Sequence, residues 1–409
     1  MKILFTNSPF YGTGWHGVKS GCRWPFIFDS ELPEENSLIG YNTMPFFMAY
    51  AASYLTARKV GDVFFYDALA LKHRYETFYK TISDINADIT IIETSTPSID
   101  IDLKVARKIK EMGSEVALCG PHATIFAESL ITLPEVDYVL QGEYEANSYE
   151  MCLMRRKGIY KCKPMENLDY LVPFRSEVCY YYADGFGQDK HIQFPQLQMW
   201  TSRGCPYKCN FCLWKDTMTF NNYRPIAIRS LMRELTSVMK EYNFKSVLFD
   251  DDTVNVGDKR TIDLSEAMSN IDIQWHAMVR ADSCSWTAFE KMRKSGCEGL
   301  KIGIETFSQQ GLDYLNKGYK SAEIIKTIDF LINLGFKCFL SFMDNIPGET
   351  EDDKKLTNDL KQGFIERGAS IQHPNCMPLP GTELYNRMKA DLSDDWFEYG
   401  KYHGEVLKQ

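Results

Sequence analysis

The stretch LQMWTSRGCPYKCNFCLW, residues 197–214, joins an apolar run to three closely spaced cysteines. The run at 197–202 predicts a β-strand. The cysteines follow it in a CxxxCxxC pattern, as Cys205, Cys209 and Cys212. In barrels and open α/β sheets, the loops beyond the C-terminal strand ends carry the chemistry. The stretch therefore predicts a functional loop at the end of a barrel strand.

The sequence downstream of this stretch alternates strand-like and helix-like segments, which is typical of a parallel sheet with crossover helices. A complete eight-stranded barrel takes about 250 residues, and the interval 196–382 is shorter. We therefore predict a partial (β/α)6 barrel over residues 196–382. Its strands are expected at 197–202, 246–251, 273–279, 299–305, 338–344 and 370–377, and its helices at 230–243, 261–271, 286–296, 321–335 and 350–368.

An earlier alternation of the same kind predicts a doubly wound, Rossmann-like α/β domain over residues 1–150. Residues 151–195 are rich in Pro, Tyr and Gly without a steady period, which predicts a linker. Residues 383–409 are expected to form a short C-terminal tail. In the first domain we expect strands at 2–7, 62–68, 88–95, 115–120 and 136–142, and helices at 45–59, 74–86, 102–113 and 123–133.

The composition is that of a globular protein, with 44% hydrophobic and 25% charged residues among 409. The net charge of −9 argues against a broad nucleic-acid-binding surface. The N-terminus MKILFTNSPF is typical of a strand rather than a signal peptide, and no apolar run reaches the roughly 18 residues of a membrane span. We therefore expect a cytoplasmic protein without a membrane span, whose cysteines stay reduced.

The three-cysteine loop has three interpretations. A structural zinc site usually has four ligands, and the nearest upstream cysteines, Cys162 and Cys179, lie across the linker. Chance clustering of buried thiols is the plainest alternative. The third interpretation is a four-iron cluster held by three thiolates, because cluster irons are normally held by one cysteine each. The iron without a cysteine would then accept an external ligand.

With Phe211 before its last cysteine, this loop resembles the signature of radical S-adenosylmethionine (SAM) enzymes. The resemblance implies a 4Fe-4S cluster held by Cys205, Cys209 and Cys212, with SAM chelating the open iron. One electron from the cluster would cleave SAM to a 5′-deoxyadenosyl radical, while the protein orients the reactants. It also implies an electron donor such as flavodoxin or ferredoxin.

Further motifs of that family are matched, in order, by FDDDT (249–253), WHAMVRADS (275–283), KIGIETFSQQGLDYLNKG (301–318), FMDNIPGET (342–350) and PLPGTELY (378–385). Arg280 would pair with the SAM carboxylate and Glu305 would face its ribose. The alternatives are a simple ion pair, solvated loop aspartates, and glycines that serve turns only. The SAM contacts that the resemblance implies are Phe211, Asp251, Arg280, Glu305, Gly348 and Gly381.

Residues 1–150 resemble the cobalamin-binding domain found in one group of these enzymes, with CGPHAT (119–124) and QGEYE (141–145) at matching places. The loop NSPFYGTGWHG (7–17) lacks the Asp-x-His-x-x-Gly pattern around His16. Cobalamin is therefore expected base-off, with no histidine ligand from the protein. The contacts implied by the resemblance are Ser95, Thr96, Cys119, Gly120, His122 and Gly142.

Together these resemblances imply a cobalamin-dependent radical SAM enzyme, similar to the class B methyltransferases. The expected reaction is methylation of an unactivated carbon, or of a phosphinate, in a small molecule or peptide. It would proceed through methylcobalamin and a 5′-deoxyadenosyl radical. No nucleic-acid partner is expected.

Two other functions stay open. One is ring formation, epimerisation or oxidative rearrangement in which cobalamin carries no methyl group. Cys297, Cys338 or Cys376 would then be candidate hydrogen-atom donors, although buried cysteines usually act as small hydrophobic residues. The other is a non-catalytic cobalamin or redox sensor. Methylthiotransferases fit poorly, because they need three further cysteines in the first domain, which has only Cys22 and Cys119 before Cys152.

Overall fold

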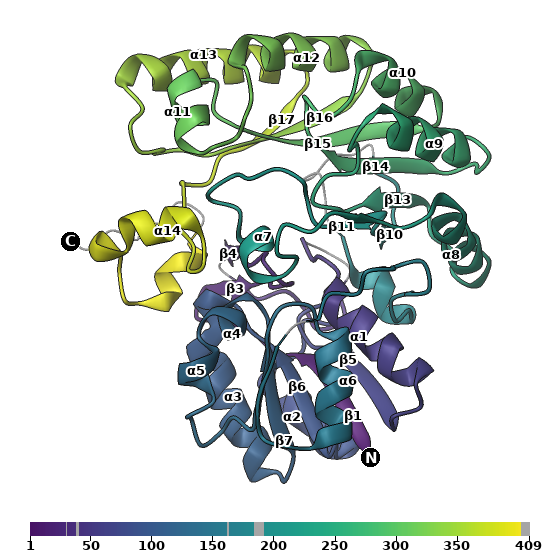
Figure 1. Ribbon diagram of the computed structural model, residues 1–409, viewed down its shortest axis with the longest axis vertical. Helices are drawn as coiled ribbons and strands as arrows, with labels where there is room; N and C mark the ends of the chain where they lie inside the picture. The colour runs from purple at the N-terminus through teal and green to yellow at the C-terminus, as the bar shows by residue number, and fades with distance from the viewer. Residues whose placement is uncertain (30, 38–40, 162, 184–191, 402–409) are drawn as a thin grey trace. The chain divides into compact units, whose positions relative to one another are not determined.

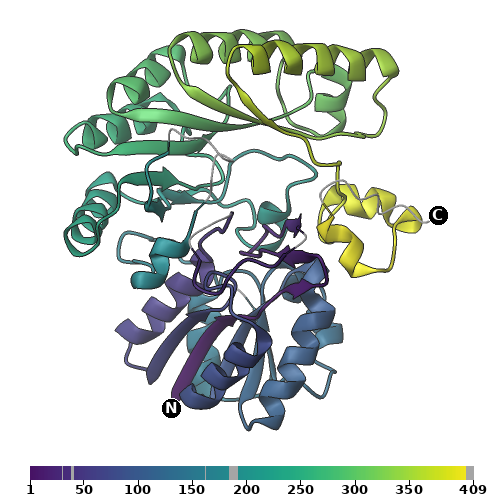
Figure 2. The same cartoon turned by 180° about the vertical axis from the view of Figure 1, so that it is seen from behind.

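A computed structural model describes residues 1–29, 31–37, 41–161, 163–183 and 192–401 (Figures 1 and 2). The chain divides into two compact units. Unit 1 comprises Met1–Ala183, Leu213–Phe220 and Leu379–Gln409, and unit 2 comprises Asp184–Cys212 and Asn221–Pro378. The chain therefore passes from unit 2 to unit 1 directly after Cys212.

Unit 1 is built on a six-stranded parallel sheet. The chain-order pattern 2-1-3-4-5-6 reverses between β1 and β6, and ligands of such sheets bind beyond the strand ends at this switch point. The doubly wound fold is confirmed. The last strand, β9, lies in the segment that we expected to be a linker. In sheet order the strands are β5 (Asp62–Asp67), β1 (Lys2–Asn7), β6 (Ile89–Glu93), β7 (Glu115–Cys119), β8 (Tyr138–Leu140) and β9 (Gly158–Tyr160).

Helices cover both faces of this sheet (Figure 1), because strands such as β6 bury every side chain. On one face α1 (Phe46–Ala57) contacts α6 (Glu145–Met154). The other face forms a core with α2, α3, α4 and α5. The single helix expected at 123–133 is instead broken at Phe126, whose backbone leaves the helical conformation. These four helices span Tyr75–Ile85, Ile99–Glu111, Pro121–Ile125 and Ala127–Leu130.

A small antiparallel sheet follows β1 and packs against the C-terminal segment within unit 1. It consists of β2 (Tyr11–Gly12), β3 (Trp15–Gly17) and β4 (Phe26–Phe28). Phe397 lies with its ring centroid 4.6 Å from that of Phe26 and 5.0 Å from that of Trp15. The described part of the expected tail therefore contributes aromatic side chains to unit 1. Its elements are α14 (Glu383–Met388), η3 (Lys389–Asp391) and η4 (Trp396–Gly400).

Unit 2 is built on a second parallel sheet, whose six strands follow one another in chain order. Its helices lie on the outer side (Figure 2), while Leu248 and Phe339 pack together with Ile192. The partial (β/α)6 barrel is confirmed. Its strands are β10 (Gln196–Met199), β13 (Ser246–Phe249), β14 (Gln274–Val279), β15 (Cys297–Glu305), β16 (Lys337–Phe342) and β17 (Ser370–Gln372).

The helices of unit 2 agree with the expected segments to within a few residues. Short elements without a usable sequence period appear in addition, such as β11 (Ser202–Arg203), β12 (Arg224–Pro225) and α11 (Gln309–Tyr314). The principal helices are α8 (Ile228–Glu241), α9 (Asp258–Met268), α10 (Trp286–Lys294), α12 (Ser321–Asn333) and α13 (Glu351–Glu366).

Candidate functional site

The cysteine loop follows β10, at the C-terminal end of the barrel strands. Gly204 begins it with φ +78°, and a Cβ atom there would lie 2.2 Å from the Asn222 carbonyl oxygen. Only glycine tolerates both conditions. Asn210 bonds through its backbone to the Leu315 carbonyl (3.0 Å), and the Asn316 amide donates to the Lys208 carbonyl (2.8 Å). The loop is therefore fastened to the segment after α11.

The three loop cysteines are not in disulfides, with Cys209 buried and the other two half-buried. Burial raises the pKa of Cys205, against the opposing effect of a hydrogen bond between its sulfur and Thr253 Oγ1, which are 3.4 Å apart. Among the described residues, no three His, Cys, Asp or Glu side chains converge on a single metal ion. A four-iron cluster binds each thiolate to a different iron. The donor set, three cysteine thiols on one fastened loop, fits such a cluster.

Arg280, at the end of β14, lies beside the buried cysteine. Its Nη1 is 3.8 Å from Cys209 Sγ, and its Nε and Nη2 donate to Asp282 at 3.0 and 2.9 Å. The guanidinium lies 3.7 Å from the ring centroid of Tyr207 and 4.4 Å from that of Tyr319. A buried cation of this kind stabilises a thiolate.

Glu305, at the end of β15, forms a buried ion pair with Lys317, with Oε1 and Nζ 2.6 Å apart. Burial acts to lower the pKa of Lys317, but the Glu305 carboxylate, with smaller contributions from Tyr319 and Cys209, raises that pKa overall. Gly303 leaves room for the pair, because a Cβ atom there would lie 2.8 Å from Glu305 Oε1. Lys317 Nζ also lies 5.8 Å from the Phe211 ring centroid. The structure thus brings Phe211, Arg280 and Glu305 together around Lys317, whose carbonyl accepts from Arg280 Nη2 at 2.9 Å.

The other predicted SAM residues have different surroundings. Asp251 is buried, and its oxygens accept hydrogen bonds from the Thr201 backbone (2.9 and 3.0 Å) and hydroxyl (2.8 Å) and from the Ser202 hydroxyl (2.6 Å). These bonds position the residues just before the cysteine loop. Gly348 has φ +89° and its carbonyl accepts from Gln310 in a turn before α13. Gly381 belongs to unit 1.

Two of the three candidate hydrogen-atom donors lie at the N-terminal ends of the barrel strands and one lies beyond the C-terminal ends. Cys297 is the first residue of β15 and Cys338 the second residue of β16, so both are at the N-terminal ends, away from the cysteine loop. Cys376 follows β17, at the C-terminal ends. Burial raises its pKa to about 12. Of the three, only Cys376 is at the same end of the strands as the cysteine loop.

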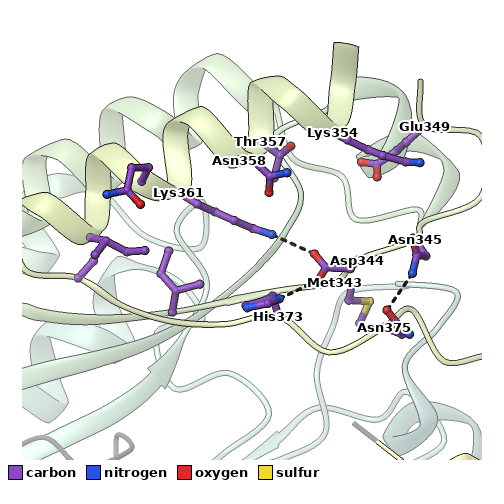
Figure 3. Close-up of a pocket in the computed structure, with 14 residues that line it drawn as sticks. Met343, Asp344, Asn345, Glu349, Lys354, Thr357, Asn358, Lys361, His373 and Asn375 are labelled. Carbon is purple, nitrogen blue, oxygen red and sulfur yellow. Dashed lines mark hydrogen bonds and ion pairs between the residues drawn. The ribbon is translucent and has the colours of Figure 1, made fainter. Parts of the chain in front are cut away.

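A cleft of about 810 Å³ lies between α13 and the loops that follow β16 and β17 (Figure 3). Asp344 is its central charge, paired with Lys361 at 3.0 Å and with His373 at 2.7 Å. Burial acts to raise the pKa of Asp344, but these two partners outweigh it and the pKa is lowered. None of the predicted cluster or SAM residues lines this cleft.

In unit 1, the predicted cobalamin residues lie at or just after the C-terminal ends of the adjacent strands β6, β7 and β8. Ser95 Oγ lies 2.8 Å from Ser98 Oγ, and the Gly142 backbone donates to Thr124 Oγ1 at 2.9 Å. Cys119 is buried in β7, with its carbonyl accepting from the Thr94 backbone at 2.8 Å. The topology therefore gathers these residues at one edge of the sheet.

At this edge, His122 and Gly120 make contacts that stabilise the local structure. His122 Nδ1 lies 3.3 Å from Thr96 Oγ1, and its ring packs against Phe126 and Trp396. Burial lowers the pKa of His122 to about 3. Gly120 has φ +106°, and a Cβ atom there would lie 2.2 Å from the Thr94 carbonyl oxygen.

Buried polar groups are concentrated at the switch point between β1 and β6. Lys19 Nζ pairs with Asp102 at 2.6 Å, and the Ser8 and Ser98 hydroxyls donate to the same carboxylate at 2.6 Å. Asn7 Oδ1, at the end of β1, is buried and accepts no hydrogen bond from any described residue. A buried acceptor without a donor at a ligand-binding edge fits an amide-bearing ligand such as a corrin.

Sequence reasoning missed the residues that surround Arg280 and Glu305. They come from three connections, with Lys317 and Tyr319 after α11, Tyr207 in the cysteine loop and Asp282 after β14. The fold brings these connections together. Lys317 stood within a segment already matched to the family, in NKG. Its place in that matched segment, in the turn after α11, is the signal that was available.

Residues 200–360 match a family model described as the radical SAM superfamily. These residues are a radical SAM domain. Such a domain implies a 4Fe-4S cluster and SAM as its cofactors, and its reaction needs a reductant and a substrate. The three-thiol loop described above lies within the matched residues.

Relatives extend the likeness beyond this domain. An uncharacterized methyltransferase, PH0819, of Pyrococcus horikoshii is 27% identical, covering 90% of this chain and 84% of its own. An anaerobic magnesium-protoporphyrin IX monomethyl ester cyclase of Rubrivivax gelatinosus is 23% identical, covering 98% of this chain and 72% of its own.

Among solved structures, the cobalamin-dependent SAM radical enzyme OxsB superposes with a TM-score of 0.73 at 15% identity. The match covers 100% of this chain and 64% of OxsB, so this chain spans a little under two thirds of that protein. The likeness shows the same fold in both units. No helix among the described residues is long and apolar enough to cross a membrane.

Proposed function

We propose that this chain is a cobalamin-dependent radical SAM methyltransferase that methylates an unactivated carbon, or a phosphinate, of a small molecule or peptide. One observation carries the proposal. A single chain pairs a three-thiol loop on a six-stranded partial barrel with a parallel sheet whose switch point is lined by buried polar groups. The relative named as a methyltransferase, similar over 90% of this chain, supports the same reaction.

In this proposal the barrel at 196–382 holds the cluster and SAM, and residues 1–150 hold cobalamin. Cys205, Cys209 and Cys212 hold the cluster, and Glu305 with Phe211 orients SAM. When bound, the cluster and SAM supply a hydrogen-abstracting carbon radical, and cobalamin supplies a transferable methyl group. The cobalamin contacts are proposed at the gathered strand ends, from Ser95, Thr96, Cys119, Gly120, His122 and Gly142.

The chain's own residues supply position and charge. Asn210, Asn316 and Gly204 hold the cysteine loop in place. Lys317 balances the buried Glu305 carboxylate, which otherwise costs several kcal/mol to bury (about 3–5). We also propose a small electron-transfer protein such as flavodoxin or ferredoxin as the reductant, and a cytoplasmic location.

The test uses the full chain, reconstituted anaerobically with iron, sulfide and cobalamin. SAM carrying a CD3 methyl group is added with dithionite. We expect 5′-deoxyadenosine in solution and CD3-labelled methylcobalamin on the protein, both measured by mass spectrometry. Replacing Cys205, Cys209 and Cys212 by alanine is expected to reduce 5′-deoxyadenosine formation to background.

The matched control is Cys152→Ala, which removes a buried thiol from α6 of unit 1. It is expected to keep both products. A wild-type chain that assembles no cluster under these conditions contradicts the proposal. So does the persistence of 5′-deoxyadenosine formation in the triple-alanine variant.

A second candidate function is supported by the cyclase relative, which is similar over 98% of this chain. In that case a radical reaction such as ring formation or oxidative rearrangement takes place without methyl transfer. The same experiment separates the two. Formation of 5′-deoxyadenosine on a cobalamin-loaded chain that never acquires the CD3 label favours this second function.

A further inference from the structure

Each of the three nitrogens of the Arg280 side chain has a protein partner. Its Nε donates to Asp282, its Nη2 to both Asp282 and the Lys317 carbonyl, and its Nη1 faces Cys209 Sγ at 3.8 Å. Four of the five guanidinium N–H groups are therefore directed at protein atoms, which leaves the second N–H of Nη1 for the SAM carboxylate contact that stays a prediction.

The surroundings hold this guanidinium rigidly. Tyr207 and Tyr319 flank it at 3.7 and 4.4 Å. The Tyr207 hydroxyl lies 2.7 Å from Ser283 Oγ. The Arg280 backbone is fixed as well, because its N–H donates to Asn255 Oδ1 at 3.0 Å and its carbonyl accepts from Asn255 Nδ2 at 2.8 Å. With 5% of its surface exposed, the charge is weakly screened by solvent.

We propose that Arg280 sets the reduction potential of the cluster by donating a charged N–H bond to the Cys209 sulfur. The inference rests on the cluster of the proposed function, but not on cobalamin or methyl transfer. Reduction adds one electron to the cluster and makes its thiolate sulfurs more negative. A nearby cation and hydrogen-bond donor stabilises that state more than the oxidised one, which raises the potential.

Asp282 allows the direction of the shift in the cluster's midpoint potential to be tested. Its carboxylate is bound to the same guanidinium and partly cancels its charge at Cys209. Arg280→Gln is therefore expected to lower the cluster's midpoint potential, whereas Asp282→Asn is expected to raise it. The second shift is the smaller one, because the Asp282 side chain is 29% exposed and is more strongly screened by solvent.

The experiment is a dithionite titration, with mediator dyes, of the full chain carrying its reconstituted cluster, without SAM or cobalamin. The electron paramagnetic resonance signal of the reduced cluster gives the midpoint potential, and iron and sulfide content give the loading. Arg280→Lys keeps the charge but not the planar fork. Its potential is expected between those of wild type and Arg280→Gln.

The matched control is Arg293→Gln. Arg293 also pairs with a carboxylate, Glu298 at 2.8 Å, but near the N-terminal end of β15. It is expected to leave the midpoint potential unchanged.

Opposite shifts in the Arg280 and Asp282 variants support the inference. Unchanged potentials in both, or shifts in the same direction, overturn it. Should Arg280→Gln fail to load a cluster, Arg280→Lys and Asp282→Asn decide by the same signs. Opposite shifts in a chain that never labels cobalamin leave this inference standing while the proposed methyl transfer fails.

Discussion

At the scale of single residues, His122 shows how burial converts into pH dependence. Burial lowers its pKa to about 3, whereas an unfolded histidine has a pKa near 6.5. Between these values the unfolded chain binds a proton that the folded chain does not. The free energy of unfolding is therefore expected to fall by about 1.4 kcal/mol per pH unit as the pH drops below about 6.5.

Hydrogen–deuterium exchange of residues 121–130 between pH 7 and 5, corrected for intrinsic rates, measures this loss. His122→Asn removes the proton-binding group from both states. In this variant, the local free energy of unfolding is expected to change less steeply with pH, by the slope that corresponds to about one bound proton. Equal slopes in the two proteins would show that His122 does not carry the effect.

The same scale shows what sequence reasoning can and cannot find at the candidate site. The cysteines stand out by their spacing after a predicted strand, whereas Arg280 and Glu305 were predicted from the resemblance of residues 275–283 and 301–318 to motifs of the radical SAM family. Lys317 binds both residues, with its carbonyl accepting from Arg280 and its ammonium pairing with Glu305. Both contacts depend on how β14, β15 and the turn after α11 are packed together. No local pattern encodes that packing, so Lys317 was found only in the fold.

At the scale of elements, two glycines give opposite predictions for the same substitution. Gly120, after β7, has φ +106° and would place a Cβ atom 2.2 Å from the Thr94 carbonyl oxygen. Gly120→Ala is expected to destabilise unit 1 by about 1–3 kcal/mol, because the ends of β6 and β7 must shift apart. Gly363 lies exposed in α13 with no atom near its missing Cβ. Gly363→Ala is expected to stabilise unit 2 by about 0.5–1 kcal/mol.

Denaturant unfolding of the two variants, followed by circular dichroism, measures both changes. A Gly120→Ala protein as stable as wild type would mean that the turn after β7 tolerates a side chain.

The longer helices and strands were predictable from the sequence, and the shortest ones were not. The parallel strands β1, β6, β7 and β15 are buried on both faces, so their apolar runs stand out. The three-residue β9 and the strands β2, β3 and β4, of two or three residues each, are too short to show a period. They exist because neighbouring strands and aromatic rings offer partners, which is tertiary information.

At the scale of the whole molecule, unit 1 is discontinuous in sequence. Leu213–Phe220 and the described part of Leu379–Gln409 belong to it, although the barrel residues lie between them. Trp214 packs on Phe47 with ring centroids 5.6 Å apart. A sequence pattern assigns contiguous segments to domains. It cannot show that a C-terminal segment packs against side chains several hundred positions earlier in the chain. The expected short tail is an example.

This discontinuity predicts the effect of truncation. A chain ending at residue 378 lacks Trp396 and Phe397, which contact His122, Phe126, Trp15 and Phe26. Because these half-buried rings cover the apolar side chains on which they pack, residues 8–28 and 121–130 are expected to exchange their amide hydrogens much faster without them. A chain ending at residue 401 keeps these side chains and is expected to retain wild-type protection. Equal protection of residues 8–28 in both truncated chains would show that unit 1 does not depend on its returning segment.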